Sequence, residues 1–319
     1  MPSLKFKNVY LKDYFTIVGP KEKQSKLKKY DLDFDDYYFE TKTFEMAEIK
    51  MQKMVIDNLL KKNNIDYIIG GDLINQIAIS SYAARNCGIP FVGIYSACSS
   101  FVEALLLAST IIDSENAQNI ICLTSSHNLT AEKQYRYPTE YGNTKPHTAT
   151  TTATGAVGAV VSKEKSRIMI KNGTFGKIID LGVNDANHMG AVMAPACADT
   201  IHNHLINNKK KPDDYDLILT GDLGKIGINI LKEYYKNAFN ETLNNVVDSG
   251  SEIYKQNQDT YSGGSGPCCL PLYFFCNILT KEKYHKILLV GTGSLHTPVL
   301  VNQHQTIPAI SHVIEIEVL

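Results

Sequence analysis

Short apolar runs alternate with segments of helical periodicity along most of the chain. Four runs predict strands in the first half, at residues 15–18, 66–69, 89–94 and 119–123. Apolar residues that recur at three- and four-residue spacing predict helices at residues 43–61, 73–86 and 101–112. Strands that alternate with helices over short connections form a parallel sheet covered on both faces, so the pattern predicts an α/β fold.

The second half repeats the first. The Gly-Asp-Leu turn of residues 71–73 recurs at 221–223, again after an apolar run, and residues 286–294 match 119–127. Such self-similarity indicates an internal duplication of a βαβαβ unit. We therefore divide the chain into two similar halves, at residues 1–165 and 166–319.

Ligands of such sheets bind outside the carboxyl ends of the strands. In this chain the loops after Ile94, Leu123, Leu219 and Val290 are expected to converge there. Any anion site must be built locally, because the formal net charge of the 319 residues is only −1 and gives no long-range field for nucleic acid or membranes.

Cysteine usage and hydropathy narrow the class of protein further. The seven cysteines show no CxxC spacing, which favours reduced thiols over a disulfide framework or a zinc site, and we expect no metal site. The N-terminus lacks an apolar signal core, and the longest apolar run is far shorter than the ~20 residues that a spanning helix needs. We expect a soluble chain without a signal peptide or transmembrane helix.

Cys98 stands at a predicted corner between the strand at 89–94 and the helix at 101–112. Unpaired N–H groups and the positive end of the helix dipole would favour a thiolate or a bound carboxylate there. Cys98 is therefore a candidate nucleophile or anion-site residue. The alternative is a small buried apolar side chain without a chemical role.

Several motifs resemble those of one known family. They include Gly70-Gly71-Asp72-Leu73, Tyr95-Ser96-Ala97-Cys98-Ser99, Ser125-Ser126-His127-Asn128, the segment 131–138 and the glycine-rich turn 262–266. Together they resemble the stage V sporulation protein AD family. The chain departs from the usual pattern at Ser96, Phe44 and Pro267. The resemblance implies a thiolase-like fold whose two βαβαβ halves pack as a layered α/β/α/β/α body.

The resemblance also implies a function. The family is associated with uptake of dipicolinic acid (pyridine-2,6-dicarboxylate), with calcium, into the developing spore. It therefore implies a non-catalytic dipicolinate-binding protein with no cofactor. The implied partners are dipicolinate, alone or as its calcium complex, membrane proteins of the same uptake system and a second copy in a homodimer. The implied location is peripheral, at the spore inner membrane or in the forespore.

An enzyme on the same fold is the alternative. Ketoacyl synthases support their cysteine with a histidine and an asparagine at turns that correspond to residues 221–224 and 262–265, and this chain offers neither. Thiolases need a second cysteine after the last core strand, where residues 290–294 contain none. We therefore expect no enzyme. A Cys98-dependent acyltransferase or condensing enzyme remains the alternative, and a scaffold with a vestigial site is a third.

A dicarboxylate on a flat ring calls for a cation and several hydrogen-bond donors. The candidate ligand-binding residues are Cys98, Ser96, Ser99, His127, Arg136 and Lys133. Arg136 is the expected principal cation, because a guanidinium can hold a carboxylate through two parallel bonds. The alternatives are an ion pair of Arg136 with Glu132 or Glu140, a neutral loop histidine at 127, and serines that only cap the helix.

Other polar residues are given structural roles. His202 and His204 are interpreted as solvated residues near a helix end, because their spacing is a weak metal signal. Asp72 and Asp222, in the repeated turns, are interpreted as helix N-caps.

Overall fold

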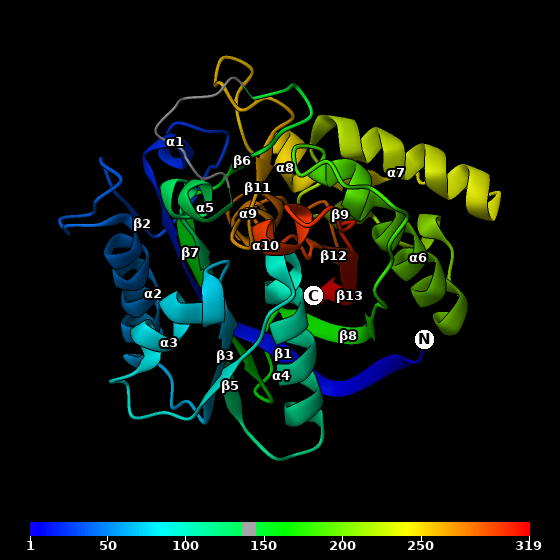
Figure 1. Ribbon diagram of the computed structural model, residues 1–319. Coiled ribbons are helices and arrows are strands. Elements are labelled where there is room, and N and C mark those ends of the chain that lie inside the picture. Colours follow the sequence, from blue (N-terminus) through cyan, green and yellow to red (C-terminus); the bar gives the residue numbers. More distant parts are fainter. Residues whose placement is uncertain (136–144) are drawn as a thin grey trace.

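The computed structural model describes residues 1–135 and 145–319. Figure 1 shows layers of helices around strands, with α4 (Ser100–Asp113) and α9 (Cys269–Tyr273) near the centre and the long α6 (Met189–Asn208) and α7 (Gly224–Phe239) together at one side. The arrangement is the mixed α/β fold that the alternating pattern predicts.

The first half contributes five strands in one order. β4 (Phe91–Gly93), β3 (Tyr67–Gly71) and β5 (Asn119–Ser126) are parallel, and β7 (Gly155–Ser162) and β1 (Ser3–Val18) continue the order as antiparallel neighbours. The predicted strand at 15–18 is thus only the end of a strand of 16 residues. The exposed Lys5, Lys7 and Asn8 interrupt the apolar residues of its first part, and register shifts break the regular alternation of its two faces.

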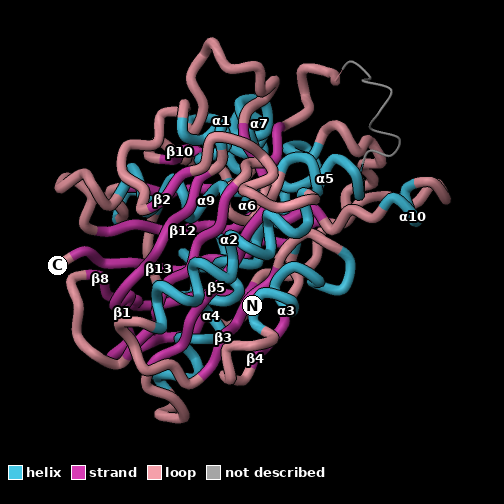
Figure 2. Tube along the Cα trace, turned by 90° about the vertical axis from the view of Figure 1, so that its left-hand side faces the viewer, coloured by secondary structure: helices cyan, strands magenta, loops and turns pink. Residues whose placement is uncertain are grey.

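The second half repeats this order. β10 (Val246–Asp248), β9 (Leu217–Thr220) and β12 (Lys286–Ser294) are parallel, followed by antiparallel β13 (Ala309–Val318) and β8 (Ile168–Phe175). β1 and β8 pair with each other, so the ten strands run as one continuous path. Figure 2 shows them crossing the molecule between helices. Two short strands pair with each other and a third with β1, namely β6 (Thr151–Thr152), β11 (Gly264–Ser265) and β2 (Leu32–Asp33).

Two predicted elements differ in detail. The run at 89–94 is not a buried strand, because β4 lies at the edge of the sheet and Val92 is 40% exposed. The helix predicted at 73–86 begins later, as a short 3₁₀ turn, η1 (Asn75–Ile77), followed by α3 (Ala78–Ala84). Gln76 and Ile77 have positive φ, which delays the regular helix.

Helices cover both outer faces. α2 (Phe44–Leu60) and α3 lie over the first half, where Met51, Val55 and Leu59 are fully or almost fully buried. α6 and α7 cover the second half through a separate apolar cluster. The remaining short helices are α1 (Pro20–Lys23), α5 (Asn128–Tyr135), η4 (Pro212–Asp214), α8 (Ser249–Glu252) and α10 (Pro298–Val301). Among the described residues no helix combines the length and hydrophobicity needed to cross a membrane.

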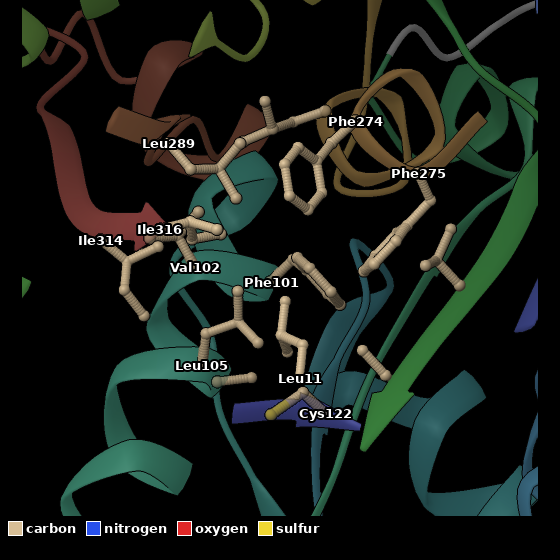
Figure 3. Close-up of a cluster of buried hydrophobic side chains, with 14 of the residues drawn as sticks. Leu11, Phe101, Val102, Leu105, Cys122, Phe274, Phe275, Leu289, Ile314 and Ile316 are labelled. Atoms are coloured by element: carbon tan, nitrogen blue, oxygen red, sulfur yellow. The ribbon is translucent and has the colours of Figure 1, made fainter. Parts of the chain in front are cut away.

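The largest apolar cluster joins the two halves. Figure 3 shows Phe101 of α4 facing Phe274 and Phe275, which belong to the π-helical turn after α9, η5 (Phe274–Ile278). The rings of Phe101 and Phe275 meet edge to face with centroids 6.1 Å apart. Leu289 of β12 and Leu11 of β1 close the same cluster from opposite halves. The central helices thus hold the duplicated halves together.

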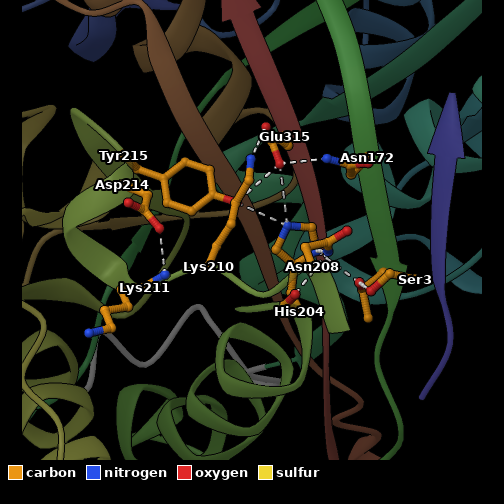
Figure 4. Close-up of polar contacts among 10 residues, drawn as sticks. Ser3, Asn172, His204, Asn208, Lys210, Lys211, Asp214, Tyr215 and Glu315 are labelled. Carbon is orange, nitrogen blue, oxygen red and sulfur yellow. Dashed lines mark hydrogen bonds and ion pairs between the residues drawn. The ribbon is translucent and has the colours of Figure 1, made fainter. Parts of the chain in front are cut away.

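A buried polar cluster anchors the end of β13 and corrects one interpretation. Glu315 accepts hydrogen bonds from Asn172 (2.8 Å), Tyr215 (3.1 Å) and the ammonium of Lys210 (2.5 Å) (Figure 4). His204 is fully buried beside it and hydrogen-bonds to Thr174 (2.8 Å). His202 stacks on Phe239 with ring centroids 3.7 Å apart. Neither histidine is a freely solvated side chain.

Candidate functional site

Cys98 lies in a tight turn between β4 and α4, as the sequence predicts. The turn is a 3₁₀ segment, η2 (Ala97–Ser99), that runs directly into α4. Ala97 has a φ of 51°, a left-handed conformation that L residues adopt at an energetic cost. The Ser100 hydroxyl accepts from the Ser96 N–H (3.1 Å) and donates to the Ala97 carbonyl (2.7 Å). Ser100, rather than Ser99, therefore secures the turn.

The carboxyl end of β12 packs directly against this turn. A Cβ on Gly293 would lie 2.2 Å from the Ser96 carbonyl oxygen, and one on Gly291 would lie 2.7 Å from the Ser99 hydroxyl oxygen. Both glycines are required by the close approach, because a side chain at either position would push the two segments apart. β12 of the second half thus fixes the position of Cys98 in the first.

The thiol of Cys98 is half-buried and uncharged at neutral pH. Burial raises its pKa well above the ordinary value, and the nearby Asp222 and Cys268 raise it further, while the Gly266 N–H offsets only part of this. The expectation that the helix terminus would favour a thiolate is therefore wrong. Among the described residues no hydrogen bond joins a histidine to Cys98, the pairing that activates nucleophilic cysteines.

Ser96 and Ser99 lie beside Cys98. Both are buried. The Ser96 hydroxyl lies near the Glu103 carboxyl group, where it offsets part of the rise that burial causes in the pKa of Glu103, and the Ser99 hydroxyl has no hydrogen-bond partner within the described ranges. The Ser99 hydroxyl faces Gly291 of β12, inside the molecule. Buried hydroxyls without hydrogen-bond partners are uncommon in proteins. The Ser96 and Ser99 hydroxyls could therefore donate to a bound ligand, provided that the ligand extends into the interior of the turn.

His127 and Lys133 are engaged elsewhere. The Nε2–H of His127 donates to the Tyr37 carbonyl (2.8 Å), while its Nδ1 accepts from the Leu129 N–H (3.2 Å). Burial lowers the pKa of His127 to about 4, so the ring is neutral and keeps no spare donor. Lys133 forms a largely exposed ion pair with Glu45 at 2.5 Å. Arg136, the expected cation, lies outside the described residues.

Four residues grouped near Cys98 were not among the sequence candidates, namely Tyr95, Tyr135, Leu295 and His296. The hydroxyls of Tyr95 and Tyr135 are 3.2 Å apart, and Tyr135 also donates to the Leu73 carbonyl (2.7 Å). Tyr135 and Leu295 share a small apolar cluster with Cys98, and the ring of His296 lies 5.4 Å from that of Tyr135. Local sequence carried no signal for this grouping, because its members come from segments far apart in the chain: the turn around residues 95–98, the end of α5 and the loop after β12. We call Cys98, Tyr95, Tyr135, Cys269 and Asp222 the Cys98 centre.

Asp222 does not cap a helix. The caps of α7 and α8 come from Asp248, which accepts from the N–H groups of Leu223 (3.1 Å), Gly224 (2.8 Å) and Ser251 (2.9 Å). Asp72, its counterpart in the first half, does accept from the Ser80 N–H in the first turn of α3 (2.8 Å). The repeated Gly-Asp-Leu turns therefore differ in role.

Comparison with known proteins decides the family. The model of the family described as "Stage V sporulation protein AD (SpoVAD)" matches residues 3–317. The chain belongs to this family. A member, "Stage V sporulation protein AD" of Bacillus subtilis (strain 168), is 40% identical over 313 residues, which are 95% of this chain and 93% of that protein. The family's resemblance in short motifs is thus confirmed along nearly the whole sequence.

Solved structures confirm the thiolase-like fold. OleA of Xanthomonas campestris, as the E117A variant bound with cerulenin, is 13% identical, has a TM-score of 0.62 and covers 98% of this chain and 97% of its own. The Ascaris suum Acat5 thiolase in complex with coenzyme A has a TM-score of 0.57 at 10% identity, covering 98% and 100%. The 3-oxoacyl-[acyl-carrier-protein] synthase III of Aquifex aeolicus has a TM-score of 0.52 at 14% identity, covering 99% and 100%. At such identities the likeness establishes the fold alone.

Proposed function

We propose that the protein binds dipicolinic acid at the Cys98 centre, without catalysing a reaction, as a component of dipicolinate and calcium uptake into the developing spore. One observation carries the proposal. Cys98 lies at a corner between a strand and a helix, as the reactive cysteine of the enzymes does. The turn after β9, however, carries the buried Asp222 where ketoacyl synthases place a histidine. A neutral thiol that has no histidine hydrogen-bonded to it among the described residues suits a binding role better than an acyl transfer.

The surroundings of Cys98 supply groups that suit a flat dicarboxylate. Tyr95, whose side chain is 45% exposed, and Tyr135 bring aromatic surface and hydroxyl groups. The Gly266 N–H points at the thiol, and the N-terminal end of α4 favours a negative group nearby. Arg136 remains the proposed principal cation, on the sequence argument that a guanidinium can pair with a carboxylate.

An acyltransferase is the second candidate. The fold it shares with OleA and the thiolase, together with a half-buried cysteine at the same kind of corner, supports it. A stable acyl adduct on Cys98 is the outcome that would favour this candidate over the binding role.

The partners follow from the family alone and remain predictions. They are calcium as a companion of dipicolinate, membrane proteins of the uptake system, a homodimer, and a peripheral place at the spore inner membrane or in the forespore.

The test of the proposed function is titration calorimetry with dipicolinate and with its monocarboxylate analogue. The wild type is expected to bind dipicolinate more tightly than the analogue. Arg136→Ala is expected to weaken dipicolinate binding by about ten- to a hundredfold, because a direct charge-assisted contact is worth roughly 1.5–3 kcal/mol. Lys133→Ala is the matched control, since its ammonium is already paired with Glu45 at the surface. Equal affinity for both ligands, or an unchanged affinity in Arg136→Ala, would show that the ligand or the cation is wrong.

A further inference from the structure

Asp222 is the buried group in the Cys98 centre that the fold itself does not explain. Its side chain is fully buried, and neither carboxylate oxygen has a hydrogen-bond partner within the described part of the chain. Its backbone N–H, by contrast, donates to the Thr292 hydroxyl at 3.2 Å. The loop is therefore held by the main chain, and the side chain is left without a structural task.

The neighbouring Asp248 and the repeat counterpart Asp72 both have structural roles, because donors surround their carboxylates. Asp248 accepts from the Thr220 hydroxyl (2.8 Å) in addition to the three N–H groups that it caps. Asp72, the repeat counterpart of Asp222, accepts from the Ile74 N–H (2.8 Å) and from both the N–H (2.8 Å) and the hydroxyl (2.7 Å) of Ser80. Among the described residues Asp222, by contrast, has no N–H or hydroxyl donor and only the weak thiol donor of Cys269 nearby, although the same turn supplies such donors in the first half.

When two carboxyl groups lie in one buried region, the group with more hydrogen-bond donors ionises more easily and the other tends to stay protonated. Asp248, with its donors, keeps a pKa of about 6 although it is buried. Burial and the charge of Asp248 raise the pKa of Asp222 well above its ordinary value, and the Cys269 thiol offsets only part of this. Burial and the nearby Asp248 therefore favour the protonated acid of Asp222, which carries one O–H donor.

The proximity of Asp222 to Cys98 indicates which ligand this donor would contact. The two groups lie close enough for a charge on Asp222 to raise the pKa of the thiol. A buried donor without an acceptor is unfavourable, and it is retained most readily where a ligand supplies the acceptor. A metal ion would be another reason for a carboxylate, but the described residues contain no group of three or more metal-ligating side chains.

We propose that the buried Asp222 side chain donates a hydrogen bond to a carboxylate oxygen of the ligand bound at Cys98. The inference rests on the proposed function and adds to it a residue and a chemical selection rule. An O–H donor to an ionised oxygen makes a short, charge-assisted bond, so the Cys98 centre selects ligands with an anionic oxygen at this position. The buried acid thereby supplies part of the stabilisation that a second cation would otherwise provide.

This role makes binding depend on pH in one direction. As pH rises through the pKa of Asp222, the donor becomes a carboxylate that repels the ligand's own, so affinity falls. Ligand binding favours the protonated form and therefore shifts the loss to higher pH. The titratable groups that face Asp222 are Asp248 at the end of β10, Cys269 of α9 and Cys98 of η2.

The experiment is titration of the full chain with dipicolinate by calorimetry from about pH 6 to about pH 9, with Asp222→Ala, Asp222→Asn and the repeat control Asp72→Asn. Asp222→Ala is expected to weaken binding at pH 7 by about tenfold or more, because the donor is lost. Asp222→Asn keeps an N–H donor that does not titrate, so it is expected to bind more weakly than the wild type at low pH and to lose the decline at high pH. Asp72→Asn is expected to keep the wild-type pH profile.

Thermal unfolding of each variant and the infrared difference between the wild type and Asp222→Asn in the carbonyl band of protonated acids provide readouts without ligand. The buried Glu22 and Glu48, whose pKa values burial raises to about 7 and about 8, contribute to that band in both proteins, so the difference isolates Asp222. If the wild type does not bind dipicolinate at any pH, the proposed function fails and this role fails with it. If the wild type binds but Asp222→Ala binds equally well, or Asp222→Asn keeps the full decline at high pH, the function stands and the role of Asp222 is wrong.

Discussion

Replacing Glu315 with alanine is expected to lower the free energy of unfolding at neutral pH by about 3 kcal/mol. The carboxylate is 5% exposed and is the shared acceptor of Asn172, Lys210 and Tyr215. Its loss leaves the Asn172 amide without this acceptor and the Lys210 ammonium unpaired, and it leaves the Tyr215 hydroxyl only its longer contact with His204 Nε2 at 3.3 Å. Urea denaturation would measure the change.

The same group predicts a dependence of stability on pH. Although burial opposes its ionisation, hydrogen bonds and the charge of Lys210 lower the pKa of Glu315 from 4.5 to about 2. A lowered pKa in the folded state stabilises the protein above the unfolded value, and this contribution is lost as pH falls from about 4.5 through about 2. The matched control is Glu317→Ala on the same strand, whose pair with Lys171 at 3.6 Å is partly exposed and is expected to cost less than about 1 kcal/mol. An equal loss in both variants would contradict the account of the cluster.

Replacing Gly293 with valine is expected to destabilise the protein by about 3 kcal/mol and to weaken ligand binding together with it. The added Cβ would lie 2.2 Å from the Ser96 carbonyl oxygen, which belongs to the backbone and cannot rotate away. Either β12 or the turn that carries Cys98 must shift. Calorimetric unfolding and dipicolinate titration of the same variant would measure both effects.

Gly221→Ala provides the control for Gly293→Val. This glycine follows β9, the parallel neighbour of β12, and its added Cβ would meet Thr292 Oγ1 at 3.3 Å, a contact that a small movement relieves. We expect a loss below about 1 kcal/mol. A Gly293 variant as stable as the Gly221 variant would mean that the approach of β12 does not fix the Cys98 turn.

The fold was largely accessible from sequence because its signal is local. Apolar runs at the strands and periodic helices recur within short windows, and the Gly-Asp-Leu turns mark the repeat. β1 was mostly missed because charged residues alternate with apolar ones at its start, for example Lys5 and Lys7. The position of β4 was predicted correctly, but its burial was not. An apolar run does not reveal which strand forms the edge of a sheet.

The site was less accessible because its hydrogen bonds are long-range. The Gly-Asp-Leu turns look alike, yet Asp248 takes over the capping in the second half. Only the packing of distant segments shows that, among the described residues, Asp222 is left without an N–H or hydroxyl donor. His204 likewise gains its environment from Glu315, far along the chain. His127 was correctly predicted at the end of its strand. Its Nε2–H, however, donates to the Tyr37 carbonyl of a distant loop, which the sequence did not reveal.

The central claim is that the Cys98 centre binds a dicarboxylate and does not form an acyl-enzyme. Alkylation with iodoacetamide at mildly alkaline pH, followed by intact and peptide mass, tests it in one measurement. Cys98 and Cys87 are the half-buried thiols among the described residues, and Cys87 serves as the internal control. Saturating dipicolinate is expected to slow labelling of Cys98 and not of Cys87, while acetyl- and malonyl-coenzyme A leave no adduct on Cys98. Labelling of Cys98 at an unchanged rate in dipicolinate, or an acyl adduct on its thiol, would contradict the account.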